Sequence, residues 1–208
     1  MRMSIRKMIV TQVASVRTGR PRDQAVNRAI LDAARDLIAE QGYGSFSIEA
    51  VAARAAVAKQ SIYRRWASKG ALLIDLYMDG LESARPLPGT GFGPDFKALM
   101  SQTVQRQRDM AYANVLKGLM IEAQSDADLR QLFIAKIVAP RRETLRRVLL
   151  QAKDKGELPA GLDVEMMLDL TFGAVWFNMI ATVEGIQSDF PERALGVFET
   201  LMAARSGA

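Results

Sequence analysis

The 208-residue sequence contains no cysteine and no histidine. The chain therefore has no disulfides, no thiolate or imidazole metal ligands, no cysteine nucleophile and no imidazole for acid–base catalysis. It also lacks a pair of carboxylates at a spacing that favours catalysis. These absences argue against most classes of enzyme, so we expect no catalytic residues, no cofactor and no metal site. An intracellular, cytoplasmic location fits the absence of cysteine.

Long apolar runs are also absent. Residues 1–16 open with Arg2, Arg6 and Lys7 before a short apolar run, which is the order found in a signal peptide. Polar residues break that run, and it is too short for the apolar core of such a peptide. Residues 170–183 carry no charge for fourteen positions, whereas a membrane span requires about 20 apolar residues. We expect neither a signal peptide nor a membrane partner.

The charge is distributed unevenly along the chain. Residues 1–70 carry 13 Lys and Arg against 5 Asp and Glu, while residues 71–208 carry 15 against 18. A basic N-terminal part on a slightly acidic remainder is typical of a nucleic-acid-binding protein whose other half has a different role.

Residues 46–73 carry the pattern of two short helices joined by a tight turn. The first helix has one apolar face and a cap residue, Ser47, and that face comprises Ile48, Val51, Ala52 and Ala55. In the second helix Ile62 and Trp66 are four residues apart, so they share a face that should point inward. This arrangement predicts a helix-turn-helix.

The outward surface of the second helix consists of hydrogen-bond donors and cations without a carboxylate, namely Lys59, Gln60, Ser61, Tyr63, Arg64 and Arg65. A helix of this size fits the major groove, where such side chains meet base edges and phosphate oxygens. We predict that these residues bind double-stranded DNA together with Ser47 and with Lys69, which begins a further helix whose N-terminus suits a phosphate. The alternative, an ordinary solvated basic helix, leaves the preceding helix unexplained.

These motifs resemble the DNA-binding head of the TetR (TetR/AcrR) family of bacterial transcriptional regulators. The resemblance covers about residues 22–80 and rests on VAARA at 51–55, AAV at 55–57, SIYRRW at 61–66 and KGAL at 69–72. The sequence departs from the pattern at Ala56, where the turn often carries glycine. An alanine at positive φ is strained by about 1–2 kcal/mol, so either the turn differs or packing offsets the strain.

We predict three parts along the chain: a basic arm over residues 1–22, a helix-turn-helix domain over 23–68 and a helical ligand-binding and dimerisation domain over 69–208. In the arm, glycine and proline should keep residues 17–22 extended, and Arg20 and Arg22 are predicted DNA contacts. This segment is similar to the core of an AT-hook, and a disordered basic tail is an equal alternative. Asp23 is the predicted N-cap of the first helix.

The fold class is predicted to be all-α, with about nine helices. The head contains a helix over residues 23–41 and a short helix that follows the cap Ser47, which residues 55–58 separate from a second short helix over about 59–66. A fourth helix over about 69–84 links the head to the body. Residues 85–94 contain three prolines and three glycines and should form a loop. Beyond the loop the apolar spacing predicts helices over 95–108, 110–123, 127–138, 141–155, 164–184 and 191–204. Pro140 should kink or restart the helical run.

A body larger than its DNA-binding head indicates regulation, and the resemblance implies a ligand cavity there. The candidates for its lining are Phe96, Met100, Asn114, Leu119, Met120, Phe133, Phe172, Trp176 and Met179, with Arg106, Thr171 and Asn178 as further polar anchors. Methionine adapts to varied apolar shapes. A set of Met and aromatic residues at helical spacing is, however, often ordinary core.

The charge-free stretch at 170–183 is apolar almost all round, so both of its sides must be covered. We predict that one side packs on the body and the other on a second copy of the chain, with a dimer interface formed by Val175, Leu195, Phe198, Leu201 and Met202. The resemblance implies that the last two helices of each chain form this contact. The predicted function is a homodimeric repressor released from a palindromic operator by a small, largely apolar effector. The alternatives are an architectural factor or activator without a ligand, and an α-helical enzyme.

Overall fold

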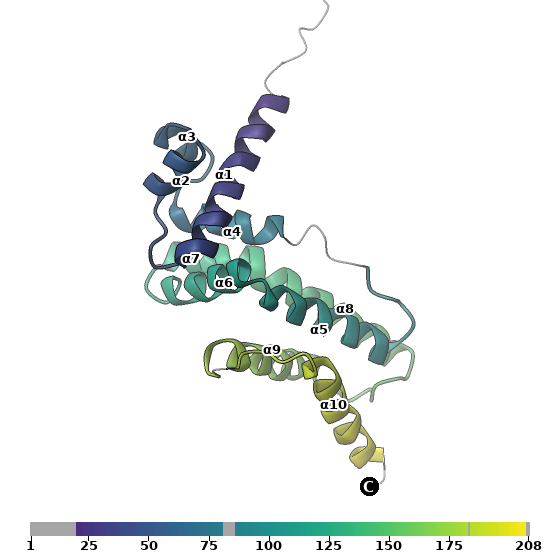
Figure 1. Cartoon of the computed structure of the whole chain (residues 1–208). Coiled ribbons are helices and arrows are strands. Elements are labelled where there is room, and N and C mark those ends of the chain that lie inside the picture. The colour runs from purple at the N-terminus through teal and green to yellow at the C-terminus, as the bar shows by residue number, and fades with distance from the viewer. Residues whose placement is uncertain (1–19, 81–85, 183, 207–208) are drawn as a thin grey trace, which may run out of the picture.

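The computed structural model describes residues 20–80, 86–182 and 184–206. All regular elements in this part of the chain are helical, which confirms the all-α prediction: α1 (Arg20–Gln41), α2 (Ile48–Arg54), α3 (Lys59–Tyr63), α4 (Lys69–Asp79), α5 (Phe92–Arg108), α6 (Met110–Glu122), α7 (Ala127–Phe133), the π turn η1 (Ile134–Val138), α8 (Ala139–Asp154), α9 (Val164–Ile180) and α10 (Phe190–Ser206). Helices α1 to α3 form a small head above a larger body (Figure 1). None of the described helices combines the length and apolar character needed to cross a bilayer.

Several helix starts are set by capping side chains that accept a hydrogen bond from a free backbone N–H. Ser47 accepts from Ala50 at the start of α2, and Ser68 accepts from Ala71 at the start of α4. Asp163 caps α9 by accepting from the N–H of Met166. These local bonds explain why the observed starts of α2, α4 and α9 agree with the sequence pattern.

Other boundaries differ from the prediction. Helix α1 begins at Arg20, so residues 20–22 are helical rather than extended and Asp23 is not the N-cap. Helix α5 begins at Phe92 with Pro94 in its first turn, where a missing N–H costs nothing. Helix α9 ends at Ile180, four residues early. The restart at Pro140 is confirmed, because α7 passes through η1 into α8 with this proline in the first turn.

The turn between α2 and α3 contains a strained alanine. Ala56 has a φ of 52°, and it is the one non-glycine residue of the described chain with a positive φ. The N–H of Val57 bonds to the carbonyl of Ala52 at 3.0 Å, and the N–H of Ala56 bonds to that of Ala53 at 3.3 Å. These two bonds form a Schellman motif, in which the position of Ala56 is normally occupied by glycine. The turn therefore adopts the Schellman geometry with alanine in place of glycine.

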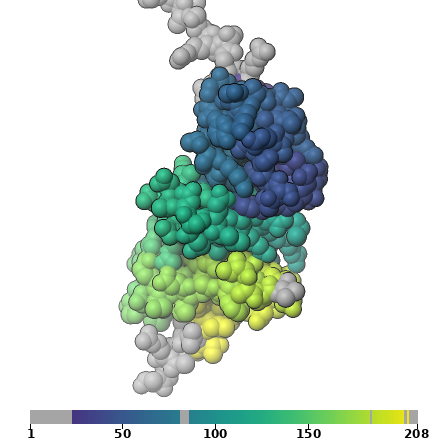
Figure 2. Space-filling model, turned by 90° about the vertical axis from the view of Figure 1, so that its left-hand side faces the viewer, coloured from purple at the N-terminus to yellow at the C-terminus, as the bar shows by residue number. Residues whose placement is uncertain are grey.

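Head and body are packed directly on each other. In Figure 2 the head lies on the body without a break, and one buried apolar cluster extends from Ile30 on α1 to Phe198 on α10. Tyr43, in the connection between α1 and α2, lies against Gly118 of α6, where an added Cβ would come within 2.1 Å of its ring. Its hydroxyl donates to Glu122 at 2.5 Å. The orientation of the head therefore depends on α6.

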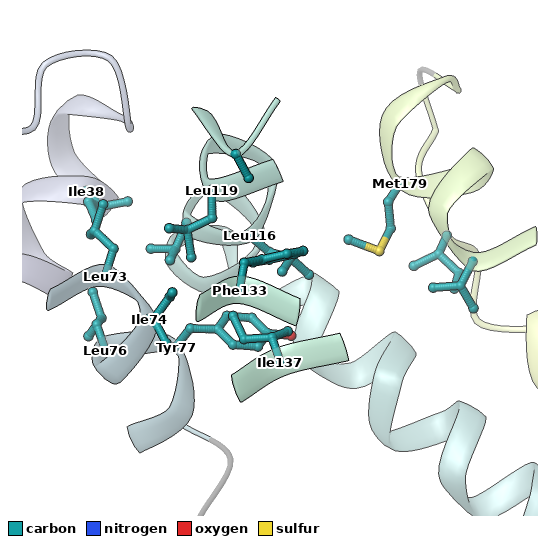
Figure 3. Packing of buried hydrophobic residues seen from close by; sticks show 14 of the residues in the cluster. Ile38, Leu73, Ile74, Leu76, Tyr77, Leu116, Leu119, Phe133, Ile137 and Met179 are labelled. Carbon is teal, nitrogen blue, oxygen red and sulfur yellow. The ribbon is translucent and has the colours of Figure 1, made fainter. Parts of the chain in front are cut away.

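The middle of this cluster joins α4 to the body. Figure 3 shows Leu73, Ile74 and Tyr77 of α4 facing Leu116 of α6 and Phe133 of α7. Burial of such side chains stabilises each by about 1.5–3 kcal/mol relative to exposure. Helix α4 is thus a structural part of both the head and the body.

Replacement of Ala56 by glycine should raise the free energy of unfolding by about 1 kcal/mol, because glycine removes the steric cost of the left-handed conformation at a smaller entropic cost. The matched control is Ala55→Gly in the same turn, where φ is −78° and glycine should be destabilising. Urea unfolding of both variants measures the difference. A loss of stability for Ala56→Gly would contradict this assignment of strain.

Candidate nucleic-acid interface

The short helix α3 is held in place by side chains on its inner face. Ile62 is fully buried and Trp66, which follows α3, is 6% exposed, as their spacing predicted. The indole Nε1–H of Trp66 donates to Asp75 of α4 at 2.7 Å. These contacts attach α3 to the rest of the head and leave its opposite face in solvent.

Arg65 was predicted to face DNA, and the structure corrects that prediction. Its side chain is 15% exposed and its guanidinium donates to Asp23 and Asn27 of α1 and to the backbone oxygen of Ser61. A guanidinium has five N–H donors in a fixed planar arrangement, so it can bond several acceptors at once. Arg65 therefore joins α3 to α1, and this tertiary pairing is invisible in the spacing within residues 46–73.

The outward face contains Gln60, Tyr63 and Arg64, all exposed as predicted, with Ser61 partly exposed. Tyr63 is 46% exposed. The described part of the chain provides no carboxylate partner for Arg64, whose guanidinium lies 3.5 Å from the hydroxyl of Ser61. This face therefore presents an unpaired cation and neutral hydrogen-bonding groups, which suits contacts to base edges and phosphates.

Lys59 is exposed but paired, which sequence reasoning missed. Its ammonium forms an ion pair with Glu49 of α2 and lies 5.7 Å from the centroid of the Tyr63 ring. The hydrogen bond between them raises the pKa of Lys59 and lowers the pKa of Glu49. A carboxylate thus borders a face that was predicted to be free of them. No signal in the sequence points to this pair, because its members belong to different helices.

Lys69 begins α4 as predicted, but the structure places its ammonium between head and body. Nζ lies 4.6 Å from the centroid of the Tyr43 ring and 4.0 Å from a carboxylate oxygen of Glu122. Burial, and then the hydrogen bond to Glu122, raises the pKa of Tyr43. These partners are at the joint with α6, so the predicted phosphate contact of Lys69 has a competing structural role.

Three further predicted DNA contacts are placed only in part. Ser47 is half-buried and caps α2, which leaves it at a helix N-terminus. Arg20 and Arg22 lie in the first turn of α1, and their side chains, like all of residues 1–19, are outside the described part. Two arginines of α8, Arg142 and Arg146, pair with the acids Asp169 and Glu165 of α9.

The residues predicted to line a ligand cavity fall into two groups. Those that are buried are Phe96, Met100, Leu119, Phe133 and Met179, and those that are partly buried are Asn114, Met120, Phe172 and Trp176. The proposed polar anchors Thr171 and Asn178 donate to the carbonyls of Met167 and Ala174 on their own helix. The structure therefore places the apolar candidates inside the body. The side chains of Thr171 and Asn178 are hydrogen-bonded to the backbone of their own helix.

The predicted dimer residues require correction. Val175 is 4% exposed and Phe198 is 6% exposed, with the ring of Phe198 packed edge-to-face on Phe96 at 5.2 Å. Both belong to the core of their own chain, Leu195 is partly buried, and the side chains of Leu201 and Met202 lie outside the described part. The exposed apolar side chains of this region are instead Met166, Leu170, Phe177, Ile180 and Val197. The structure therefore removes Val175 and Phe198 from the predicted interface, whereas Leu195, Leu201 and Met202 stay predictions.

Comparison with known proteins agrees with this architecture. Residues 30–76 match the family model described as bacterial regulatory proteins of the tetR family, and residues 92–197 match the model of the tetracyclin repressor-like C-terminal domain. An uncharacterised HTH-type transcriptional regulator of Bacillus subtilis, YdeS, is 30% identical over 83% of this chain and 87% of its own length.

Solved structures give the same result. FadR from Bacillus subtilis, crystallised with stearoyl-CoA, has a TM-score of 0.66 and 26% identity over 84% of this chain and 97% of its own. The fatty acid degradation regulator FadR from Bacillus halodurans has a TM-score of 0.67 and 25% identity over 85% and 94%. Together with the helix-turn-helix geometry of α2 and α3, these matches show that the chain belongs to the TetR family of bacterial regulatory proteins and is a DNA-binding transcriptional regulator, not an enzyme.

Proposed function

We propose that the protein is a homodimeric repressor that acts in the cytoplasm, binds a palindromic operator and is released by a small, largely apolar effector. The observation that carries the dimer is an exposed apolar stripe on α9, formed by Met166, Leu170, Phe177 and Ile180. Their spacing of four, seven and three residues, with Gly173 between Leu170 and Phe177, puts them on one helical face. A continuous apolar surface of this kind is typical of a protein–protein contact.

A two-fold axis through this stripe would bring α9 of each protomer against its copy. Val197 on α10 is also exposed, at 57%, and Gly173 has no neighbouring atom within 4 Å of its Cβ position, so a second helix has room to approach α9. A single head reads too few base pairs to select one genomic site, whereas two heads on a two-fold axis read two half-sites.

In this arrangement the outward face of α3 enters the major groove. We assign base readout to Gln60 and Lys59, and phosphate contacts to Tyr63 and Arg64, with Ser61 and Ser47 alongside. Arg65 acts indirectly, because it positions α3. The three-part organisation into arm, head and body remains our proposal, with α4 shared between the last two.

The effector part of the proposal rests on the apolar interior between α5, α6, α7 and α9, where Phe96, Met100, Leu119, Phe133 and Met179 are buried. The similar FadR from Bacillus subtilis was crystallised with stearoyl-CoA, a ligand with a long apolar chain. An effector releases DNA only if it prefers a conformer whose heads are wrongly spaced. Tyr43, held between Gly118 and Glu122, links that interior to the head.

Gln60→Ala should reduce the preference for an operator selected from a random duplex library, whereas Tyr63→Phe should weaken binding to selected and scrambled duplexes alike. Contacts to phosphates carry little sequence information, and the loss of one good base contact reduces discrimination by about 1–3 kcal/mol. Titrations on both duplexes measure this. Equal losses on both for Gln60→Ala would refute its role in base readout.

Glu49→Gln should tighten binding to any duplex, because it releases Lys59 from its ion pair and removes a nearby negative charge. The freed ammonium is one more uncompensated cation at the DNA surface, and each such cation that releases a counterion from the duplex steepens the slope of log affinity against log salt by about 0.9. Glu192→Gln, which removes the partner of Lys97 on the body, is the control with the same change in net charge. If both variants shifted the slope equally, net charge rather than the freed lysine would be responsible.

Phe177→Asp should give folded monomers that lose specific operator binding, because an unpaired charge in a buried contact costs several kcal/mol. Phe177 is 60% exposed in the single chain, so the protomer itself should remain stable. Met110→Asp, at a residue that is 66% exposed on α6, is the matched control. Sedimentation measures the oligomeric state of both variants, and titration measures their operator affinity. A stable Phe177→Asp dimer would mean that the interface lies elsewhere.

A further inference from the structure

Two arginines of the body flank the same buried ring. Tyr77 of α4 is fully buried, and Figure 3 shows its ring extending from α4 towards Ile137, beside Phe133. The guanidinium carbon of Arg106 on α5 lies 5.8 Å from the centroid of this ring, and that of Arg141 on α8 lies 5.0 Å from it. Two cations from different helices therefore meet at one aromatic residue.

Neither cation has an anionic partner in the described chain. Four other arginines of the described chain are partly buried, and each of them pairs with a carboxylate: Arg35, Arg65, Arg142 and Arg146. Arg106 instead donates to the backbone oxygen of Gly80. Burial, and to a smaller extent the charge of Arg141, lowers the pKa of Arg106. Two half-buried like charges repel each other, and an anion between them would relieve that repulsion.

One acidic group of the described chain acts on Arg106, and it is already engaged in other hydrogen bonds. Asp109 acts on Arg106 at a distance, but its Oδ1 accepts hydrogen bonds from the backbone N–H groups of Ala111 and Tyr112 at the start of α6. The ring of Tyr112 lies 5.6 Å from the guanidinium carbon of Arg106. The neighbourhood is thus aromatic and cationic, without a free carboxylate from the described chain.

The ring of Tyr77 also carries a buried polar atom without a hydrogen-bond partner in the described chain. In the described chain, two buried side-chain polar atoms have no hydrogen-bond partner: the hydroxyl of Tyr77 and the amide oxygen Oε1 of Gln107, which follows Arg106 on α5. Leaving such a group unpaired costs about 1–3 kcal/mol. A buried hydroxyl donor beside two uncompensated guanidiniums indicates a ligand that supplies acceptors.

We propose that Arg106, Arg141 and the hydroxyl of Tyr77 bind the anionic group of the effector, a carboxylate or a phosphate ester attached to an apolar chain. Guanidinium forks match the paired oxygens of both groups, and Phe133 and Ile137 next to the ring provide apolar surface for the attached chain. This inference rests on the proposed effector-controlled function and narrows the effector to amphiphilic acids.

The first experiment compares probes that share one alkyl chain. Dodecanoate, dodecyl phosphate, dodecanol and dodecyltrimethylammonium are titrated calorimetrically into the full-length protein, with inorganic phosphate as the control without a chain. We expect both anions to bind at least tenfold more tightly than the alcohol and the cation, and the better of the two anions identifies the headgroup. Equal binding of dodecanol and both anions would overturn the proposal, and so would the absence of binding by either anion.

Arg141→Gln should weaken the preferred anion about tenfold and leave dodecanol unchanged, since one charge-assisted hydrogen bond contributes about 1.5–3 kcal/mol. Arg147→Gln is the matched control, because Arg147 is exposed on the same helix. Arg141→Lys keeps the charge but loses the paired N–H donors of the guanidinium. Its affinity for the anion should lie between those of Arg141→Gln and Arg147→Gln. An anion preference that survives Arg141→Gln would overturn the assignment.

Tyr77→Phe separates binding from folding. The hydroxyl has no partner in the free protein, so its removal should leave the melting temperature unchanged or higher and still weaken anion binding. A large loss of stability would show that the hydroxyl serves the fold instead. Anion-selective binding without release of operator DNA would support this site and refute effector control, whereas release by dodecanol as effective as by dodecanoate would retain effector control and refute the site.

Discussion

A helix of five residues cannot form by itself in water, because its few internal hydrogen bonds do not offset the cost of nucleation. Helix α3, which carries the side chains that we propose to face DNA, has this length. It exists only because neighbouring helices hold it: Ile62 and Trp66 bury its inner face, and Arg65 joins it to α1. Every contact that the protein makes through α3 depends on this tertiary support.

The same dependence explains what the sequence predicted and what it did not. Apolar spacing and caps such as Ser47 and Asp163 are local signals, so the helices and most of their starts were predicted closely. The inward positions of Ile62 and Trp66 followed from a four-residue period. Arg65 and Lys59 could not be assigned, because their partners Asp23 and Glu49 lie on other helices and only the folded chain brings them together.

Faces were harder to predict than helices in the body. Helix α9 is apolar almost all round, so periodicity could not distinguish the side that packs on the core from the side left in solvent. The structure makes that distinction, with Val175 turned inward and Phe177 outward. The role of Tyr77 was also hidden, since a tyrosine on an apolar helix face is indistinguishable from core until its two arginine neighbours are placed.

The close packing of Tyr43 on Gly118 has a mechanical consequence. The contact leaves no space for even a methyl group, so the head cannot slide on α6 and must tilt about this point if α6 shifts. Helix α3 lies away from α6, beyond α2 in the head (Figure 1). We therefore expect the head to rotate about its contact with Gly118. A sub-ångström displacement of α6 would then move α3, which is farther from this contact, by a larger distance.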